Sequence, residues 1–542
     1  MMLMKYATEE KLRGGFYTPE NIARFILRWS VNGNKNYDVL EPSCGDGVFL
    51  EQIRANNFEY RTVTAIELDE LEAKKAQKVG LPDSIVLNED FYKYCNSTMK
   101  KFDLIVGNPP YIRYQFFNKE QRAEAEKIFV RAGLKYSKLT NAWVSFVVGS
   151  SLLLKEHGKI AFVLPAELLQ VSFAKQLRIF LARYYNKINI VSFKKLVFPH
   201  IQQEVILLLC ERNGSDAHLI EHLELEDAEG LERIDISELK SPKKKLDFKS
   251  NKWTFYFLHQ VEIDFIEKLL KQKDILPLKY YANVEVGMTT GSNEFFTVPF
   301  NMVKMYNLEE YAEPLVGRSV QVPSLILTKE DWKANTKNGA RAYFLKFPNL
   351  AELKKNKSAL EYLKYGESKS INKLYKTRIR EEWQTVPSAW VSEALFIRRN
   401  NIFPKLIINE AKAYTTDTMH RVTLNKNIRL KGVNKVNIEA LVASYYNSLS
   451  LAFAEISGRS HGGGVLELMP NEAENILIPY REENAKLLPQ IDKMMRDKVS
   501  IDEILKYTDN KILKEGHGLS ESEIMLCNRI WKKLQKRRLG RA

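Results

Sequence analysis

The chain has 542 residues, of which 45% are hydrophobic and 27% charged. This length exceeds that of one typical core and predicts two or three globular domains, and the composition excludes disordered and fibrous proteins. The sequence contains no apolar run of the ~18 residues that a membrane span needs, and residues 1–15 lack the apolar core of a secretory signal. We therefore expect a soluble, cytoplasmic protein without a membrane partner. The formal net charge of +15 fits either a nucleic-acid partner or a solubilising surface.

The four cysteines, Cys44, Cys95, Cys210 and Cys527, lie far apart and form no CxxC pair. This spacing argues against structural zinc and suits a reducing compartment. We therefore expect neither disulfide bonds nor a bound metal.

Residues from about 15 to 210 alternate short apolar runs with stretches of helical periodicity. Strands are expected at Tyr37–Leu40, Thr62–Ile66, Ile85–Leu87, Phe102–Val106, Lys159–Leu164 and Glu204–Cys210. The alternation predicts a largely parallel, doubly wound, Rossmann-like α/β sheet with helices on both faces. Ligands of such sheets bind beyond the carboxyl ends of the strands.

The pattern changes after the basic segment Ser241–Lys245, where no strand–helix rhythm continues. We predict a first domain at residues 1–245, a mixed α+β second domain at 246–480 and a basic helical extension at 481–542. Residues 411–422 are predicted to be extended, 438–454 helical and 457–464 a flexible glycine loop. The terminal stretch Trp531–Arg538 predicts either a solvated basic helix or a phosphate contact.

Three successive predicted strands end in residues that suit a nucleotide-like ligand. The first leads through Glu41 into a tight turn, in which Gly45 and Gly47 lack the Cβ atoms that would keep a ligand from the backbone. The second ends in Glu67, whose carboxylate can accept hydrogen bonds from ribose hydroxyls. The third leads into Asp90-Phe91, a carboxylate for an adenine amino group beside an aromatic face for the ring.

The fourth strand stops at Asn108-Pro109-Pro110-Tyr111. Prolines have a fixed φ and no N–H, so the amide oxygen of Asn108 and the carbonyl of Pro109 can act as a pair of acceptors. Two acceptors aimed at one amino group bind both its hydrogens and free the nitrogen lone pair as a nucleophile. The Tyr111 ring offers a face on which a base flipped from a duplex can stack.

These residues resemble the gamma-class, TaqI-like DNA adenine-N6 methyltransferases of type II restriction–modification systems. The resemblance covers residues from about 14 to 210, beginning with Gly15-Phe16-Tyr17-Thr18-Pro19. It implies a site-specific bacterial or archaeal enzyme that transfers methyl from S-adenosylmethionine to a flipped adenine in double-stranded DNA. A cognate restriction endonuclease, if one exists, would be encoded separately.

The resemblance also implies the roles of individual residues. It assigns the cofactor to Thr18, Pro19, Glu41, Cys44, Gly45, Gly47, Glu67, Leu68, Asp90 and Phe91. It assigns catalysis to Asn108, Pro109, Pro110 and Tyr111, with Phe198 against the flipped base opposite Tyr111; otherwise Phe198 is an ordinary core aromatic. Cys44 is not expected to act as a nucleophile, since the transfer is direct.

Beyond residue 245 the resemblance is looser, but it implies a target-recognition domain that reads DNA through its grooves. The predicted DNA-contacting residues are Arg318, Lys376, Arg378, Arg459 and His461, and Arg380 and Trp383, which follow the second and third of these in the sequence, are also candidate contacts. Each is also compatible with a basic surface turn that contacts nothing.

Other functions remain open. Methyltransferases acting on RNA or on a protein glutamine also carry Asn-Pro-Pro-Tyr, but the nearly 300 residues after the catalytic half favour DNA. Cytosine N4 is a second possible target, although Ser is commoner at the position of Asn108 in that chemistry. A fused restriction–modification enzyme would need a nuclease, for which Glu410-Ala411-Lys412 gives a superficial ExK match without a partner aspartate. An inactive methylase fold serving as a DNA-binding module is disfavoured by the intact motif.

Overall fold

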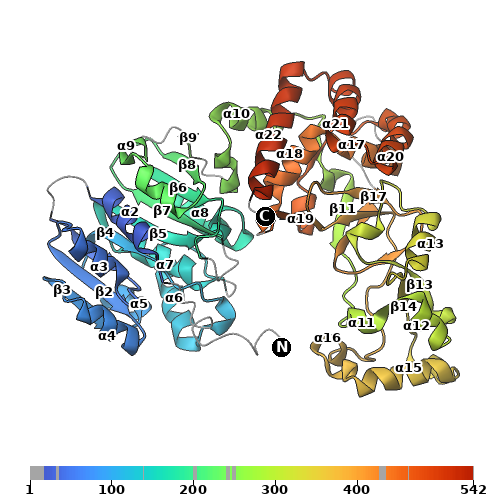
Figure 1. The fold of residues 1–542 in the computed structure, drawn as a ribbon, viewed down its shortest axis with the longest axis horizontal. Coiled ribbons are helices and arrows are strands. Elements are labelled where there is room, and N and C mark those ends of the chain that lie inside the picture. Colours follow the sequence, from blue (N-terminus) through green and yellow to red (C-terminus); the bar gives the residue numbers. More distant parts are fainter. Residues whose placement is uncertain are drawn as a thin grey trace. The chain divides into compact units, whose positions relative to one another are not determined.

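The computed structural model describes residues 17–31, 36–137, 140–198, 204–239, 244–246, 252–426, 435–461 and 463–540. The chain forms two compact units, Met1–Ile263 and Asp264–Ala542, and each is described by itself (Figure 1). The boundary falls within helix α10 (Gln260–Leu269).

The first unit is built on a nine-stranded sheet of order β3-β2-β1-β4-β5-β7-β6-β8-β9. Its strands are β1 (Asp38–Glu41), β2 (Thr62–Glu67), β3 (Ser84–Asn88), β4 (Phe102–Gly107), β5 (Leu154–Pro165), β6 (Lys187–Phe193), β7 (Val205–Glu211), β8 (Leu219–Leu225) and β9 (Lys244–Lys245). The five neighbouring strands β3, β2, β1, β4 and β5 run parallel to one another, and β6 runs parallel to β8. All six predicted strands are confirmed, and the Rossmann-like fold class with them.

Two features of this sheet were not predicted. Strands β6, β8 and β9 extend it beyond the predicted set, and β7 runs antiparallel between β5 and β6. The sequence of β7 is a continuous apolar run like that of a parallel strand, because in this sheet antiparallel and parallel strands alike are buried on both faces. Its direction depends on where the chain returns to the sheet, which local patterning does not encode.

Helices cover both faces of this sheet (Figure 1). They are α2 (Glu20–Ser30), α3 (Val48–Ala55), α4 (Glu70–Lys78), α5 (Phe91–Ser97), α6 (Lys119–Arg131), α7 (Ala142–Leu152), α8 (Lys175–Tyr184) and the short α9 (Ile236–Leu239). Side chains of α2, α3 and α4 share one core with alternate residues of the strands, such as Val39, Val63 and Val106. Helices α5, α6 and α7 pack against one another as a second group. Side chains alternate between the two faces along each strand, so the strands are covered on both faces by helices. The polar residues at the strand ends lie beyond this core.

In the described part of the second unit, short strands form four small sheets. They are β10 (Leu276–Pro277) with β22 (Leu477–Ile478); β11 (Ala282–Val286), β19 (Met419–Leu424), β15 (Ala394–Ile397) and β17 (Leu406–Ile408); β12 (Thr297–Val298), β14 (Tyr343–Leu345), β13 (Ala312–Val316) and β18 (Tyr414–Thr415); and β16 (Arg399–Asn400), β21 (Val465–Glu467) and β20 (Arg459–His461). A mixed α+β architecture was predicted for this part of the chain, and the sheets fit it.

The second unit also contains many helices. They are α11 (Asn293–Phe296), α12 (Phe300–Met305), α13 (Lys329–Lys337), α14 (Leu350–Leu353), α15 (Lys357–Ser368), α16 (Tyr375–Arg378), α17 (Ile438–Tyr445), α18 (Ser448–Ser457), α19 (Pro470–Ala473), α20 (Leu488–Arg496), α21 (Ile501–Thr508), the π-helical segment Asp509–Gly516 and α22 (Glu521–Leu539). The helices predicted from residue 485 onward are therefore present.

Three local predictions in this unit were wrong in detail. The glycine-rich stretch 457–464 is not simply a loop, because its residues 459–461 form β20, which pairs with β21. The predicted helix 438–454 is two helices, broken at Asn447, whose side chain caps α18. The predicted extended segment 411–422 contains β18 and most of β19 as expected, but it begins with a turn in which Lys412 has a φ of +51° and which the Asn409 side chain holds through the N–H and the carbonyl of Ala413.

The terminal basic helix is not a solvated surface helix. Trp531 and Arg538 of α22 are both buried. The Arg538 guanidinium donates to both carboxylate oxygens of Glu455 in α18 and also to carbonyls of residues 401, 402 and 464. Helix α22 is therefore packed into the second unit.

Candidate active site

A cavity of about 480 Å³ lies at the carboxyl ends of β1 to β4, a size typical of small-molecule sites. Ten of the predicted residues line it: Thr18, Glu41, Cys44, Gly45, Glu67, Leu68, Asp90, Phe91, Asn108 and Pro110. Five predicted residues are not part of this lining: Pro19, Gly47, Pro109, Tyr111 and Phe198. Fold topology therefore brings four separate strand ends to one site.

The two glycines of the turn after β1 are needed for different structural reasons. Gly45 has a φ of +54°, a left-handed conformation that disfavours other residues, and a Cβ there would meet no atom within 4 Å. Gly47 has a φ of +100°, and its Cβ would lie 3.0 Å from the Cα of Ala76 in α4. Gly47 thus allows close packing of the turn on α4, whereas we expected it to make room for a ligand.

Glu67 holds the turn in place from the end of β2. One carboxylate oxygen accepts a hydrogen bond from the Gly45 N–H at 2.9 Å and the other from the Asp69 N–H at 2.8 Å. Burial raises the pKa of Glu67, and these two backbone bonds oppose that rise. Each oxygen retains a lone pair, so the carboxylate can accept further hydrogen bonds from a ligand in the cavity.

The cavity is strongly acidic. The described lining contains seven acidic residues and no Lys, Arg or His; the acids are Glu41, Asp46, Glu67, Asp69, Glu72, Glu89 and Asp90. Glu41 is 2% exposed, and its Oε2 has no hydrogen-bond partner among the described residues. Burial, with Glu67 and Asp46 nearby, raises the pKa of Glu41 well above its usual value. A cationic ligand would lower the electrostatic cost of holding these acidic side chains together, of which Glu72 already pairs with Lys75 at 2.7 Å.

Aromatic side chains form another wall of the cavity. Phe91 stacks on Phe146 with ring centroids 4.7 Å apart, and Tyr92 lies edge-on to Phe146 at 5.2 Å. Phe117 approaches Tyr92 at 6.2 Å. Phe117 and Phe146 were not predicted, because Phe117 lies in the segment before α6 and Phe146 in α7, and no local pattern marks either residue as ligand-facing. Tyr17, next to the predicted Thr18, also lines the cavity.

The Asn108-Pro109-Pro110-Tyr111 segment follows β4 directly. The backbone carbonyl of Asn108 accepts a hydrogen bond from the Ser43 hydroxyl at 3.3 Å, which ties the segment to the turn after β1. The Tyr111 ring packs against the core cluster of the first unit, and burial raises the pKa of its hydroxyl. Asn108 and Pro110 therefore face the acidic cavity, while Tyr111 lies against the core.

Phe198 and Cys44 are both buried. Phe198 belongs to the same core cluster as the Tyr111 ring, and its expected contact with a flipped base stays a prediction. Burial beside Glu41 raises the pKa of the Cys44 thiol, so a thiolate is strongly disfavoured there. In the described chain no three His, Cys, Asp or Glu side chains are grouped as metal ligands would be.

Two family models match the chain. Residues 21–198 match the Eco57I restriction-modification methylase, and residues 250–513 match the C-terminal domain of the type II methyltransferase M.Eco57I. The chain belongs to the Eco57I-like type II restriction–modification methylases.

Individual proteins that are similar to this chain include two methyltransferases and one restriction–modification enzyme. The type II methyltransferase M.AccI of Acinetobacter calcoaceticus is 26% identical over 92% of this chain and 89% of its own. The tRNA1(Val) (adenine(37)-N6)-methyltransferase of Haemophilus influenzae is 29% identical over 24% of this chain and 54% of its own. A nuclease-deletion mutant of the Type ISP restriction-modification enzyme LlaGI, bound to a DNA substrate mimic, covers 91% of this chain and 55% of that one, at 12% identity and a TM-score of 0.48.

This methylase is thus a site-specific DNA methyltransferase that serves as a modification component. The resemblance to type II restriction–modification methylases seen in the sequence is confirmed by the two family matches. Within the described ranges, no helix combines the length and the apolar character that a bilayer crossing requires.

Several DNA-contacting residues predicted for the methylase lie on linked elements of its second unit. The Thr418 hydroxyl donates to the Gly317 carbonyl at 2.8 Å, beside the exposed Arg318. The Arg398 guanidinium donates to the Asp417 carbonyl at 3.2 Å. Loop 317–320, turn 416–418 and Arg398 therefore form one connected surface.

The same surface continues into the β20–β21 hairpin. Glu467 of β21 pairs with Arg398 at 3.0 Å, with Arg399 at 2.9 Å and with His461 at 3.0 Å. These partners lower the pKa of Glu467 to about 2, the hydrogen bond from His461 contributing most. Arg459 instead pairs with Glu472 at 2.9 Å. We call loop 317–320, turn 416–418, residues 398–399 and hairpin 459–467 the cationic edge.

Lys376 and Arg378 are exposed on the short helix α16. The neighbouring Arg380 is used internally, since its guanidinium donates to the carbonyls of Thr289 and Thr290 at 3.1 and 2.7 Å. Trp383, also considered from the sequence, packs into an aromatic cluster against Phe295.

Proposed function

We propose that this methylase transfers a methyl group to the N6 amino group of an adenine flipped out of double-stranded DNA, and that it protects host DNA from a separately encoded restriction endonuclease. The observation that carries the proposal is that Asn108 and Pro110, from the motif at the end of β4, face the acidic cavity. The name of the Haemophilus influenzae relative specifies adenine N6 chemistry and supports adenine as the base.

The cavity suits S-adenosylmethionine, which supplies a methyl group on a positively charged sulfonium. Seven carboxylates without a lining cation fit a cationic ligand, and the unpartnered Oε2 of Glu41 fits its ammonium group. Glu67 would accept hydrogen bonds from the ribose hydroxyls. Asp90 would accept from the adenine amino group, with Phe91 against the ring. Thr18 and Pro19, Cys44, Gly45, Gly47 and Leu68 would complete the binding site.

The protein's own contribution to the transfer is position and hydrogen bonding. The Asn108 amide oxygen and the Pro109 carbonyl would each accept a hydrogen bond from the target amine, which leaves the nitrogen lone pair free to attack the methyl carbon. The N–CH₃ bond forms as the S–CH₃ bond breaks with its electron pair on sulfur, and the methylated nitrogen loses one proton to solvent. Pro110 fixes the backbone that aims these acceptors. Tyr111 and Phe198 would hold the base by stacking and edge contact. No covalent enzyme intermediate is required, which agrees with a Cys44 thiol kept protonated by burial.

We further propose that the two halves of the chain divide the work. Residues 1–245 would carry catalysis, residues 246–480 would recognise DNA, and residues 481–542 would be a helical extension of the recognition part. The proposed DNA contacts are Arg318, Lys376, Arg378, Arg459 and His461. Of these, Arg318 and His461 have exposed side chains on the cationic edge.

Incubation of the purified protein with methyl-labelled S-adenosylmethionine and unmethylated genomic DNA tests this function. We expect N6-methyladenine at one short motif, detected by nucleoside analysis and single-molecule sequencing. N4-methylcytosine would overturn adenine as the target. Label in RNA or protein, with none in DNA, would overturn DNA as the substrate. Cleavage of unmethylated DNA by the purified chain alone would instead identify a fused restriction–modification enzyme.

A further inference from the structure

The loop Gly317–Val320 lies on the cationic edge and exposes an apolar side chain beside a cation. Val320 is 80% exposed, and Arg318 and Ser319 are also exposed. A single exposed valine on a mobile loop would mean little, because scattered apolar side chains are normal on protein surfaces. What distinguishes this loop is how firmly the chain on either side of Val320 is held.

The upstream side is held by the preceding strand and by Gln321. Strand β13 pairs with β14 and with β18 and ends at Val316. The buried Gln321 then accepts hydrogen bonds on its amide oxygen from the N–H groups of Gly317 and Arg318, both at 2.8 Å. One buried side chain thus fixes the backbone of the loop from its far end.

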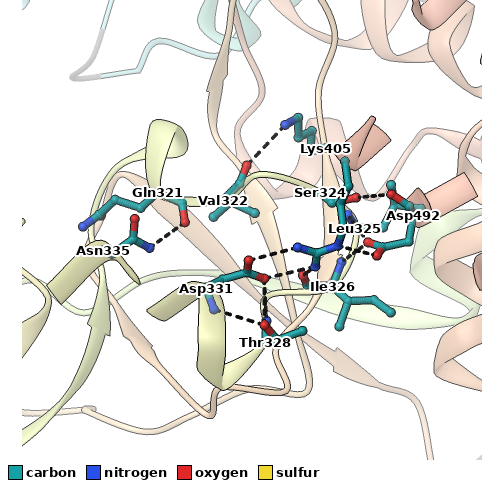
Figure 2. Close-up of polar contacts among 11 residues, drawn as sticks. Gln321, Val322, Ser324, Leu325, Ile326, Thr328, Asp331, Asn335, Lys405 and Asp492 are labelled. Carbon is teal, nitrogen blue, oxygen red and sulfur yellow. Dashed lines mark hydrogen bonds and ion pairs between the residues drawn. The ribbon is translucent and has the colours of Figure 1, made fainter. Parts of the chain in front are cut away.

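The downstream side is held by α20 (Figure 2). One carboxylate oxygen of Asp492 accepts from the N–H groups of Leu325 and Ile326 at 3.0 and 3.1 Å. The Ser324 hydroxyl donates to the Asp492 carbonyl at 2.9 Å. Arg496 binds the same carboxylate at 2.7 Å and donates to the Ile326 carbonyl at 2.8 Å. Two residues of one helix, Asp492 through its carboxylate and its backbone carbonyl and Arg496 through its guanidinium, therefore hold three consecutive residues.

Two further side chains hold the residues between Val320 and Ser324. Asn335 of α13 donates to the Gln321 carbonyl at 2.8 Å, and Lys405 donates to the Val322 carbonyl at 3.3 Å (Figure 2). Arg496 also pairs with Asp331 of α13 at 2.9 Å, which joins both helices into one support. Val320 cannot bury its side chain without breaking several of these bonds, so the loop is preorganised with that side chain in solvent.

We propose that Val320 and Arg318 read base-pair edges in the target duplex and so set part of the recognition sequence; this rests on the function proposed above. An arginine matches the acceptor pair of guanine, and a small apolar side chain matches the methyl group of thymine, both in the major groove. A rigid loop that carries one of each can discriminate bases at little entropic cost. Arg399 on the same edge, which is exposed although it pairs with Glu467, would contact a flanking phosphate.

The test compares Val320→Ala with a matched control, Val130→Ala. Val130 of α6 in the first unit is 68% exposed, so the same two methyl groups are removed from a similar surface. Each enzyme methylates genomic DNA in a limited reaction, and single-molecule sequencing gives its relative rate at the wild-type motif and at every single-base variant of it. Val320→Ala is expected to lose roughly threefold to tenfold in discrimination at one position, while Val130→Ala keeps the wild-type profile.

Arg318 is tested by Arg318→Ala and Arg318→Lys. Base reading predicts that both lose ~10-fold or more in discrimination at one position, since lysine lacks the two-pronged donor geometry. If lysine restores the wild-type profile, Arg318 only neutralises a phosphate and its reading role is overturned. A Val320→Ala profile identical to that of Val130→Ala overturns the role of Val320. Absence of DNA methylation by the wild-type protein overturns the proposed function itself, whatever the variants do.

Discussion

The Glu67 carboxylate connects the turn after β1 to the cofactor, which makes Glu67→Gln an informative substitution. The two carboxylate oxygens accept hydrogen bonds from the Gly45 and Asp69 N–H groups at 2.9 and 2.8 Å. Glutamine keeps one of these oxygens and places an NH₂ group where the other stood. Its hydrogens then point at a backbone N–H, so one of the two bonds is lost together with the negative charge.

The expected loss of affinity follows from this geometry. A hydrogen bond to a charged group contributes ~1.5–3 kcal/mol, which corresponds to a roughly 10- to 150-fold weaker Kd for S-adenosylmethionine. Loss of the turn's backbone bond acts in the same direction. Removing one of seven cavity carboxylates also weakens the attraction for a cation.

Isothermal titration calorimetry of the purified protein with S-adenosylmethionine measures this Kd directly. The matched control is Glu70→Gln, because Glu70 is exposed at the start of α4 and pairs there with Lys74 at 2.6 Å. We expect Glu70→Gln to bind as the wild type does. A Kd for Glu67→Gln within about twofold of both would refute the assignment of Glu67 to the cofactor.

Three further predictions concern catalysis and stability. Asn108→Ala should lower the rate of methyl transfer at least ~100-fold, because one of the two hydrogen-bond acceptors for the target amine is lost. The Kd for S-adenosylmethionine should change only a few fold. A near-normal rate in a single-turnover assay would contradict the mechanism. Burial raises the pKa of Asp509 from 3.8 to about 6, so its protonated form stabilises the fold below pH ~4 and that stability is lost as pH rises through 6. Asp509→Asn should therefore gain up to ~3 kcal/mol in urea unfolding at pH 7 and flatten the pH 4–6 dependence, unlike the exposed Asp497→Asn. Arg538→Met leaves Glu455 buried without its cation and should cost ~3–5 kcal/mol, with partial recovery in the double variant with Glu455→Gln; an unchanged Tm would show the pair to be dispensable.

The order of strands and their polar ends were accessible from the sequence. Each buried strand is a short apolar run, and the residues directly after each run are a local feature: Glu41 and the glycine turn, Glu67, Asp90-Phe91 and Asn108-Pro109. Parallel topology then sends these ends to one edge of the sheet, and the cavity at that edge is lined by residues from all four. Local patterning sufficed here because backbone periodicity and turn chemistry act over a few residues.

The structural role of each residue was harder to predict from the sequence. The sequence could not distinguish a glycine that admits a ligand from one that admits a helix, and Gly47 proved to be the second kind. It could not reveal that Arg538, in a terminal run of basic residues, is buried against Glu455. Both depend on a neighbour brought close by folding, Ala76 in the first case and α18 in the second.

The sequence by itself therefore determined the fold class, the family and the strand-end residues, since these follow from patterns that each segment carries alone. Only the tertiary structure decided that Phe117 and Phe146 form an aromatic wall, that β7 runs antiparallel, and that the cationic edge is one connected surface. These features join residues tens to hundreds of positions apart, and which of them meet is set by the packing of the whole unit rather than by any local preference.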